Sequence, residues 1–336
     1  MVGSAEGGSA NRPEPFLRGR HKCVRNTAHQ IISEINPFPA DKPPMMTLVE
    51  PVTSEKADRY KALALESLRQ LPPFSPVFMK LMESLARENV SVAELADWIE
   101  KDAIIAGQLL RTVNSSAYGI RGTVSSVRHA IAVLGISKLR NLALGLSVLR
   151  IFSRIRVPKS WSTSRYNLHS AATAIMADQL ALYRASEFGE GAFIAGLLHD
   201  IGRMVIAIGL TPQYEVIQQM ELETGAPIWR CEQEVLGFSH AELAGLILQR
   251  WNLPKPIQVA AETHHYPPST NGGLVPLGQI VSLANDIVNK MGICITPKAA
   301  PQEEAGPILT ENGWGEVSDK IIRTFVTEFQ AMRGSF

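Results

Sequence analysis

The sequence has little cysteine, with three in 336 residues. Cys23, Cys231 and Cys294 are odd in number, lie far apart and form no C-x-x-C pair. Disulfide-stabilised secreted domains use an even set of cysteines, and cysteine-based metal sites use closely spaced pairs. The pattern therefore argues against both, and it predicts a protein of the reducing cytoplasm.

An excess of charge of one sign is also missing, because 33 lysines and arginines stand against 32 aspartates and glutamates, a formal net charge of +1. Proteins that hold nucleic acid by its phosphates usually carry a basic field. Two short helices expected over residues 91–114 resemble a helix-turn-helix, but the second offers only Gln108 and Arg111 for base or phosphate contacts. DNA is therefore not expected as a partner.

No apolar run approaches the roughly 20 residues that span a bilayer, and the amino terminus, MVGSAEGGSANRPEP, lacks the apolar core of a secretory signal. The most apolar stretch, Leu142 to Leu149, lies between Arg140 and Arg150. We expect it to form a buried helix of a water-soluble protein that does not associate with membranes.

Residues 1–55 are rich in glycine, serine and proline. Such a composition buries too little apolar surface to offset the entropy lost on ordering, so the segment is predicted to be a disordered extension. The ordered domain is expected over 65–290, in helical halves of 65–155 and 160–290. Residues 291–336 are expected to form a C-terminal extension that ends in a helix.

Helix-start signals recur throughout the remaining chain. Ser91 followed by Glu94 has the capping-box pattern, and Asp102, Ser126 and Ser137 each precede apolar residues at helical spacing. Sustained period-two alternation is missing, and the connections between the expected helices are short. The fold class predicted is all-α, a compact multi-helix array in two helical halves.

An imidazole and a carboxylate interrupt the apolar stretch from Phe193 to Asp200 (FIAGLLHD). Burying such groups without partners costs several kcal/mol. Neighbours on a helix point about 100° apart, so His199 and Asp200 can approach one point from adjacent directions, and the two oxygens of Asp200 suit a bridge between two metal ions. Gly202 would let another helix come close.

Further histidines and an aspartate occupy helix positions among small or apolar residues, where inward-facing side chains are expected. A single histidine is better explained as a core or surface residue, and His21, His29 and His129 keep that interpretation. The joint pattern indicates a site for one or two divalent transition-metal ions, with iron, manganese, zinc and nickel all compatible. The predicted ligands are His169, His199, Asp200, His240, His264, His265 and Asp286.

The order of these residues resembles the ligand order of the HD superfamily of metal-dependent phosphohydrolases, particularly its two-metal HD-GYP branch. The centre of the match is Gly196 to Gly202 (GLLHDIG). The preceding half resembles the HDOD family in Leu71 to Pro76 (LPPFSP), Val113 to Gly119 (VNSSAYG) and Val124 to Gly135 (VSSVRHAIAVLG). The resemblance covers about residues 65–290 and implies a helical fold with a regulatory role in bacterial signalling.

Two departures from the HD-GYP pattern bear on activity. Arg203 stands where that branch has a lysine, and no Gly-Tyr-Pro element follows His264 and His265. The function expected is therefore regulation through a signalling protein partner, with slow or undetectable turnover. The alternative is a metal-dependent phosphohydrolase acting on a nucleotide or cyclic dinucleotide, in which Asp200 and Arg203 would be catalytic.

Overall fold

The computed structural model of the protein describes residues 52–87, 89–270, 273–296 and 302–334. The chain divides into two units, residues 1–37 and 38–336, and every described residue belongs to the second. The expected disordered extension falls outside the described residues up to position 51.

Most α-helices of the first half of the domain begin at a residue whose side chain caps the helix. Ser91 and Glu94 form both hydrogen bonds of a capping box, and the Asp102 carboxylate accepts from the main-chain N–H of Ile104 and Ile105. The helices are α2 (Ser54–Ser67), η1 (Leu68–Gln70), α3 (Pro76–Glu83), η2 (Ser84–Ala86), α4 (Val92–Glu100), α5 (Ala103–Val113), α6 (Val127–Leu134) and α7 (Ile136–Phe152).

One predicted helix start is wrong. Ser137 lies inside the first turn of α7, which begins at Ile136 and has no side-chain cap. Gly135, with φ of 86°, ends α6 and directly precedes α7. A side chain at position 135 would be strained in this left-handed backbone region, which glycine adopts readily.

The second half and the C-terminal residues are also helical. Together with the first half they confirm the all-α prediction, since the described residues contain only an isolated bridge between Ser186 and Val275 and no sheet. The elements are α8 (Thr163–Leu182), η3 (Gly189–Gly191), α9 (Ala192–Leu198), α10 (Ile201–Gly209), α11 (Thr211–Thr224), α12 (Ile228–Leu236), α13 (His240–Arg250), α14 (Lys255–Thr263), α15 (Leu277–Lys290), α16 (Ala305–Glu311), η4 (Gly315–Val317) and α17 (Ser318–Arg333).

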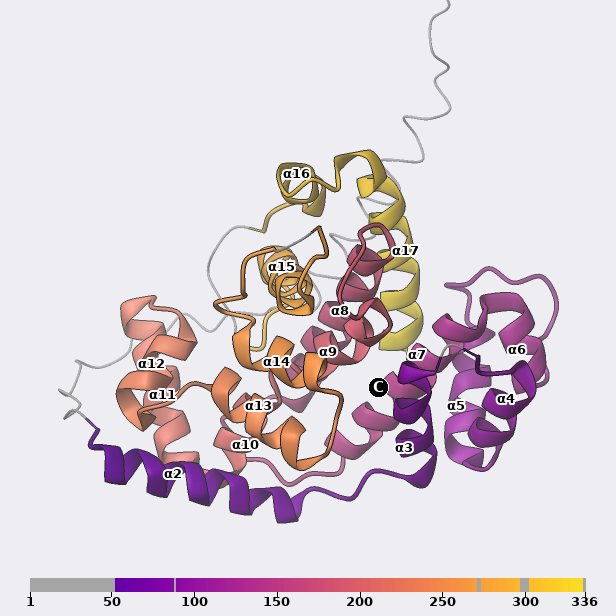
Figure 1. Ribbon diagram of the computed structural model, residues 1–336. Helices are drawn as coiled ribbons and strands as arrows, with labels where there is room; N and C mark the ends of the chain where they lie inside the picture. The colour runs from indigo at the N-terminus through magenta and orange to yellow at the C-terminus, as the bar shows by residue number, and fades with distance from the viewer. Residues whose placement is uncertain (1–51, 88, 271–272, 297–301, 335–336) are drawn as a thin grey trace, which may run out of the picture. The chain divides into compact units, whose positions relative to one another are not determined.

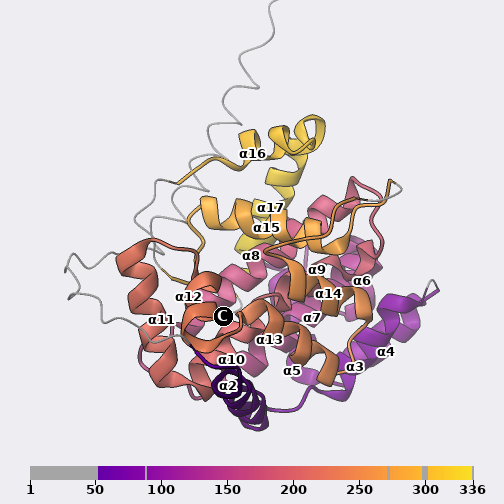
Figure 2. The same cartoon turned by 60° about the vertical axis from the view of Figure 1, so that its left-hand side comes forward.

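Helix α7 joins the two halves. Every residue from Leu139 to Leu149 is buried, as expected for the most apolar stretch of the sequence. Helices α3, α5 and α6 pack against α7 from the first half, and α8 and α9 pack against it from the second. Figures 1 and 2 show α8, α9, α13, α14 and α15 gathered together, with α11 and α12 to one side.

Among the described residues, one stretch is long and apolar enough to cross a membrane by length and composition. The expectation that no apolar run approaches the length needed to span a bilayer is therefore wrong for this stretch, Gly189–Gly209. It comprises η3, α9 and α10, and 94% of its most apolar window is buried inside the protein. Its position is therefore that of core helices.

The C-terminal helix α17 packs along α8 and completes the core of the second half. Ile321, Phe325, Phe329 and Met332 are buried on its inner face. Helix α17 is thus packed on the domain and covers one side of α8.

Candidate metal centre

Five imidazoles and one carboxylate converge in the interior of the second half. Gly196 and Gly202 permit the approach of the helices that carry them, because a Cβ at Gly202 would collide with the main-chain oxygen of His240, and one at Gly196 would lie 2.8 Å from the oxygen of Thr173. The converging residues are His169 in α8, His199 and Asp200 at the break between α9 and α10, His240 at the start of α13, and His264 and His265 at the end of α14.

Asp200 is the shared neighbour of four of these imidazoles. Its Oδ1 lies 2.9 Å from Nε2 of His240 and 3.6 Å from Nε2 of His264. Its Oδ2 lies 3.6 Å from Nε2 of His199 and 3.7 Å from Nε2 of His169. All five residues are at most 2% exposed, so the interactions take place away from bulk water.

The hydrogen-bond partner of Nδ1, the ring nitrogen that faces away from Asp200, shows which tautomer three of these imidazoles adopt. Nδ1 lies 2.7 Å from the oxygen of Ile293 in His169, 2.8 Å from that of Gly196 in His199, and 2.7 Å from that of Ala261 in His264. A carbonyl oxygen only accepts, so each Nδ1 carries the hydrogen and each Nε2 presents a lone pair. All three Nε2 atoms are buried without a hydrogen-bond partner.

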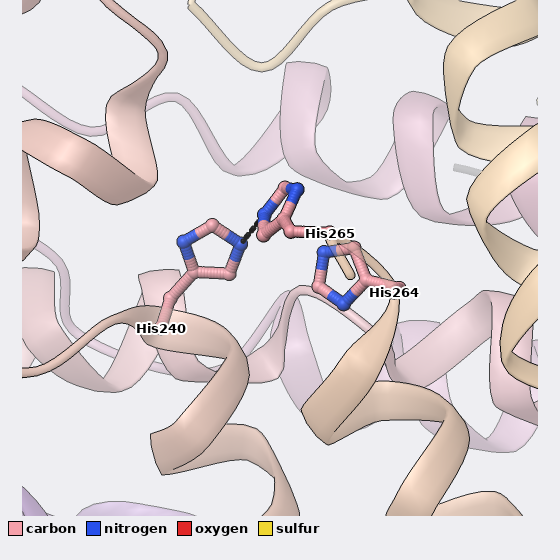
Figure 3. Close-up of side chains that lie close together, drawn as sticks. All are labelled: His240, His264 and His265. Carbon is pink, nitrogen blue, oxygen red and sulfur yellow. Dashed lines mark hydrogen bonds between the residues drawn. The ribbon is translucent and has the colours of Figure 1, made fainter. Parts of the chain in front are cut away.

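The candidate ligands form two groups, and within each group the ligand atoms lie within 4.8 Å of one another. One contains His169, His199 and Asp200, and the other His240, His264 and His265. Figure 3 shows the second group, in which Nε2 of His265 lies 3.0 Å from Nε2 of His240. Lone pairs on imidazole and a shared carboxylate suit a borderline transition metal, and the residues present therefore fit such an ion.

Burial keeps most of these imidazoles neutral, which is the form that binds metal. It lowers the pKa of His169 to about 4 and that of His265 to about 2, and it also lowers the pKa values of His199 and His264. The nearby Asp200 raises all four values but does not offset burial.

His240 differs because it faces two carboxylates. Burial lowers its pKa, but Glu232 and Asp200 outweigh burial and raise the value to about 9. Burial likewise opposes ionisation of Asp200, yet the positive charges of His240 and Arg203 hold the Asp200 pKa well below its ordinary value. Glu232 was missed from the sequence, although its place on the apolar stripe of Ile228 and Val235 in α12 was a usable signal.

Arg203 lies inside the centre. Its side chain is buried, Nη1 is 3.6 Å from Oδ2 of Asp200, and Nη2 donates to Oγ1 of Thr296 at 2.9 Å. The neighbouring carboxylates Asp200 and Glu221 outweigh burial and raise the arginine's pKa above its ordinary value. The guanidinium is therefore a buried cation beside the ligands.

The expectation that Asp286 is a buried ligand is wrong. Its side chain is 50% exposed and pairs with Lys290 at 3.1 Å, and it joins neither ligand group, although it lines the cleft that leads to them. Asn285 takes the buried place instead, on the face of α15 that carries Ala284 and Val288. One residue along a helix turns the side chain by about 100°, which is enough to exchange core for surface.

A cleft of about 730 Å³ reaches the centre from the surface. Asp200, His240 and His264 lie at its inner end, and α15 and the first turn of α12 form part of its walls. Other lining residues include Arg203, Trp229, His265, Asn285, Asn289 and Thr296. The centre is thus buried yet accessible to a small polar molecule.

Fold and site together define, over the described residues, an all-α protein built around an internal histidine and aspartate centre. The profile of the HDOD domain matches residues 71–267, more than half of the chain. The chain belongs to the HDOD domain family.

Solved structures share this fold. An HDOD domain protein of unknown function from Geobacter sulfurreducens has a TM-score of 0.62 and 21% identity, over 80% of this chain and 88% of that one. A candidate signal transduction protein from Marinobacter aquaeolei VT8 has a TM-score of 0.63 and 21% identity, over 94% of this chain and 66% of that one. A candidate phosphohydrolase from Shewanella amazonensis SB2B has a TM-score of 0.61 and 20% identity, over 81% and 98%.

A curated relative, an uncharacterized protein from Treponema pallidum, is 24% identical over 225 residues. The match takes in 66% of this chain but 42% of the relative's length. The chain therefore spans less than half of that protein.

Proposed function

We propose that this chain is a regulatory HDOD protein of bacterial signalling, which binds a divalent transition metal around Asp200 and acts through a signalling protein partner. The metal assignment is carried by one observation: the Nε2 atoms of His169, His199 and His264 are buried without a hydrogen-bond partner and approach Asp200. Unpartnered buried polar atoms are costly, and metal bound at the two ligand groups would satisfy all three.

The position of Arg203 supports regulation over rapid turnover. A bound divalent ion would supply Lewis-acid activation of a phosphoester, but efficient transfer also needs the phosphate held in line. The arginine that would hold it is buried and already engaged by Asp200 and Thr296. The centre is therefore better suited to fixing α8, α9, α13 and α14 relative to one another.

Elemental analysis of the full-length protein, purified without a metal-chelating tag, tests the metal assignment. We expect near-stoichiometric transition metal in the wild type and strong depletion in Asp200→Ala, because the shared carboxylate ligand is lost. Asp58→Ala removes an exposed carboxylate of α2 and should retain the metal. A wild type that contains no transition metal and takes up none of added Mn²⁺, Fe²⁺, Zn²⁺ or Ni²⁺ would contradict the assignment.

The cleft favours a second candidate function, a metal-dependent phosphohydrolase acting on a nucleotide or cyclic dinucleotide. It gives a small molecule access to His240, His264 and Asp200, and its lining includes the side chains of Trp229 and Asn289. In this case Asp200 would hold the ion and Arg203 would face the phosphate.

Turnover separates the two functions. We expect slow or undetectable hydrolysis of bis(p-nitrophenyl) phosphate and of cyclic dinucleotides by the metal-loaded wild type. Brisk hydrolysis that Asp200→Ala abolishes, with the helical far-ultraviolet spectrum unchanged, would replace the regulatory proposal with the enzymatic one.

A further inference from the structure

A second carboxylate, Glu232 of α12, lies behind the candidate metal ligand His240. The residue is 2% exposed, and one of its side-chain oxygens makes two short contacts with His240. Oε2 accepts from the main-chain N–H of His240 at 2.7 Å and lies 2.6 Å from Nδ1 of that imidazole. The opposite ring nitrogen, Nε2, is the atom that lies 2.9 Å from Oδ1 of Asp200.

This arrangement makes His240 different from its neighbours in the centre. Nδ1 of His169, His199 and His264 meets a main-chain carbonyl, whereas Nδ1 of His240 meets an ionisable carboxylate. A carboxylate behind an imidazole fixes the ring's orientation, places the hydrogen on Nδ1 and increases the basicity of Nε2.

Helix α12 also reaches the centre through its first turn. The indole of Trp229 lies with its centroid 6.0 Å from the imidazole of His265 and 4.9 Å from the ring of Tyr266. Trp229 also lines the cleft. The helix therefore contacts α13 through Glu232 and the end of α14 through Trp229.

We propose that Glu232 is a positioning residue. It orients the His240 ring so that Nε2 can bind the metal, and it connects α12 to the metal centre. The inference rests on the proposed metal-binding function and extends it to a residue outside the ligand set. Metal binding then orders α12, including the cleft wall that Trp229 forms.

A purely structural role for Glu232 makes a different prediction. His240 is the first residue of α13, and the contact from Glu232 to its main-chain N–H satisfies one of the free donors at that helix start. If capping were the whole role, loss of the carboxylate would lower the melting temperature of the metal-free protein and leave its metal affinity unchanged.

Titration of Co²⁺ alone into chelator-treated full-length protein distinguishes the two roles. Glu232→Gln keeps the size of the side chain and removes its charge, and Glu234→Gln makes the same change at an exposed position of the same helix. We expect Glu232→Gln to bind Co²⁺ about 10- to 100-fold more weakly than the wild type, the usual effect of losing such a partner. Glu234→Gln should bind like the wild type.

Amide hydrogen exchange of the same samples measures whether metal binding orders α12. We expect Co²⁺ to slow exchange of the α12 amides in the wild type and in Glu234→Gln, but not in Glu232→Gln at saturating Co²⁺. Should Glu232→Gln fail to fold by far-ultraviolet circular dichroism, Glu232→Asp replaces it, since a carboxylate one methylene shorter no longer spans both contacts.

The outcomes separate this inference from the proposed function. A Glu232 variant that binds Co²⁺ with wild-type affinity overturns the inference and leaves metal binding in place. The same holds if Co²⁺ does not change the amide hydrogen exchange of α12 in the wild type. A wild type that binds no Co²⁺ overturns the proposed function, and the inference with it.

Discussion

The charge of each residue in the centre follows from its neighbours. Asp200 and Glu232 are two buried carboxylates, and Arg203 and His240 are the two cations that face them. Burial lowers the pKa of His240, but the two carboxylates outweigh burial and raise it to about 9. Without metal, the His240 imidazole therefore keeps both hydrogens at neutral pH, one toward each carboxylate.

Metal binding at His240 should consequently release a proton. Below pH 9 the ion must displace the hydrogen on Nε2, so we expect metal affinity to rise about tenfold for each pH unit between pH 6 and 8. Isothermal titration with Co²⁺ in two buffers of different ionisation enthalpy measures the protons released, about one per ion. An affinity independent of pH in this range would show that His240 is neutral before binding.

Gly202 is the residue at which α10 meets the start of α13. An added methyl group would collide with the main-chain oxygen of His240, which cannot rotate away. We expect Gly202→Ala to lower the free energy of unfolding by about 1–3 kcal/mol or more, measured by urea denaturation. Gly107→Ala is the matched control in α5, where the added Cβ meets nothing, and it should raise that free energy by about 0.5–1 kcal/mol. Equal effects at both positions would refute the packing argument.

At the scale of elements, α7, α8 and α17 meet through polar groups. Asn141 donates to Oδ1 of Asp178 at 2.8 Å, and Lys138 pairs with Glu328 at 2.6 Å. Burial, together with the charges of Glu328 and Glu190, raises the pKa of Asp178 to about 7, against the opposing effect of the hydrogen bond from Asn141. The contact region of α7, α8 and α17 therefore favours the protonated form of Asp178.

The sign of the pH effect follows from this raised pKa. The folded protein binds the Asp178 proton more tightly than the unfolded chain, so its stabilising contribution is full below about pH 4 and is lost as the pH rises through about 7. We expect Asp178→Asn, which stays neutral, to gain melting temperature relative to the wild type on going from pH 5 to pH 8. The exposed Asp58→Asn should show a constant difference over this range, and a constant difference for Asp178→Asn would contradict the argument.

Helix α17 is an integral part of the core. Phe325 is 2% exposed and stacks with Phe329 at a centroid distance of 5.6 Å. We expect Phe325→Ala to lower the free energy of unfolding by about 3–5 kcal/mol, measured by urea denaturation. Arg323→Ala, at an exposed position of the same helix, should change it by less than about 0.5 kcal/mol. A small effect at Phe325 would mean that α17 unfolds separately from the domain.

At the scale of the whole molecule, the centre joins helices that are distant in the sequence. The candidate ligands run from His169 to His265, so metal bound at both ligand groups, which share the neighbour Asp200, would hold α8, α9, α13 and α14 together. An ion bound only by the folded state at 100 times its Kd adds about 2.7 kcal/mol of stability. We expect a chelator to lower the melting temperature by about 5–10 °C in the wild type and not in Asp200→Ala. Equal shifts in the two proteins would argue against a structural ion.

Much of the fold could be predicted from the sequence because helix signals are local. The capping box of Ser91 and Glu94, the cap at Asp102 and the buried stretch around Leu142 to Leu149 all depend on residues within a few positions of one another. The polar pair of His199 and Asp200 within an apolar stretch was also a local signal, since burial of such groups demands partners.

The partners themselves were decided by tertiary structure. Glu232 lies eight residues before His240 on another helix, and its role depends on how α12 packs against α13. Asp286 and Asn285 are adjacent in the sequence, and the rotation of α15 alone determines which one is buried. The sequence by itself determined the helices and most of the histidine and aspartate set, because periodicity and capping act over a few residues. Only the packed structure decided which side chains meet, because helix rotation and the approach of distant helices depend on contacts across the whole domain.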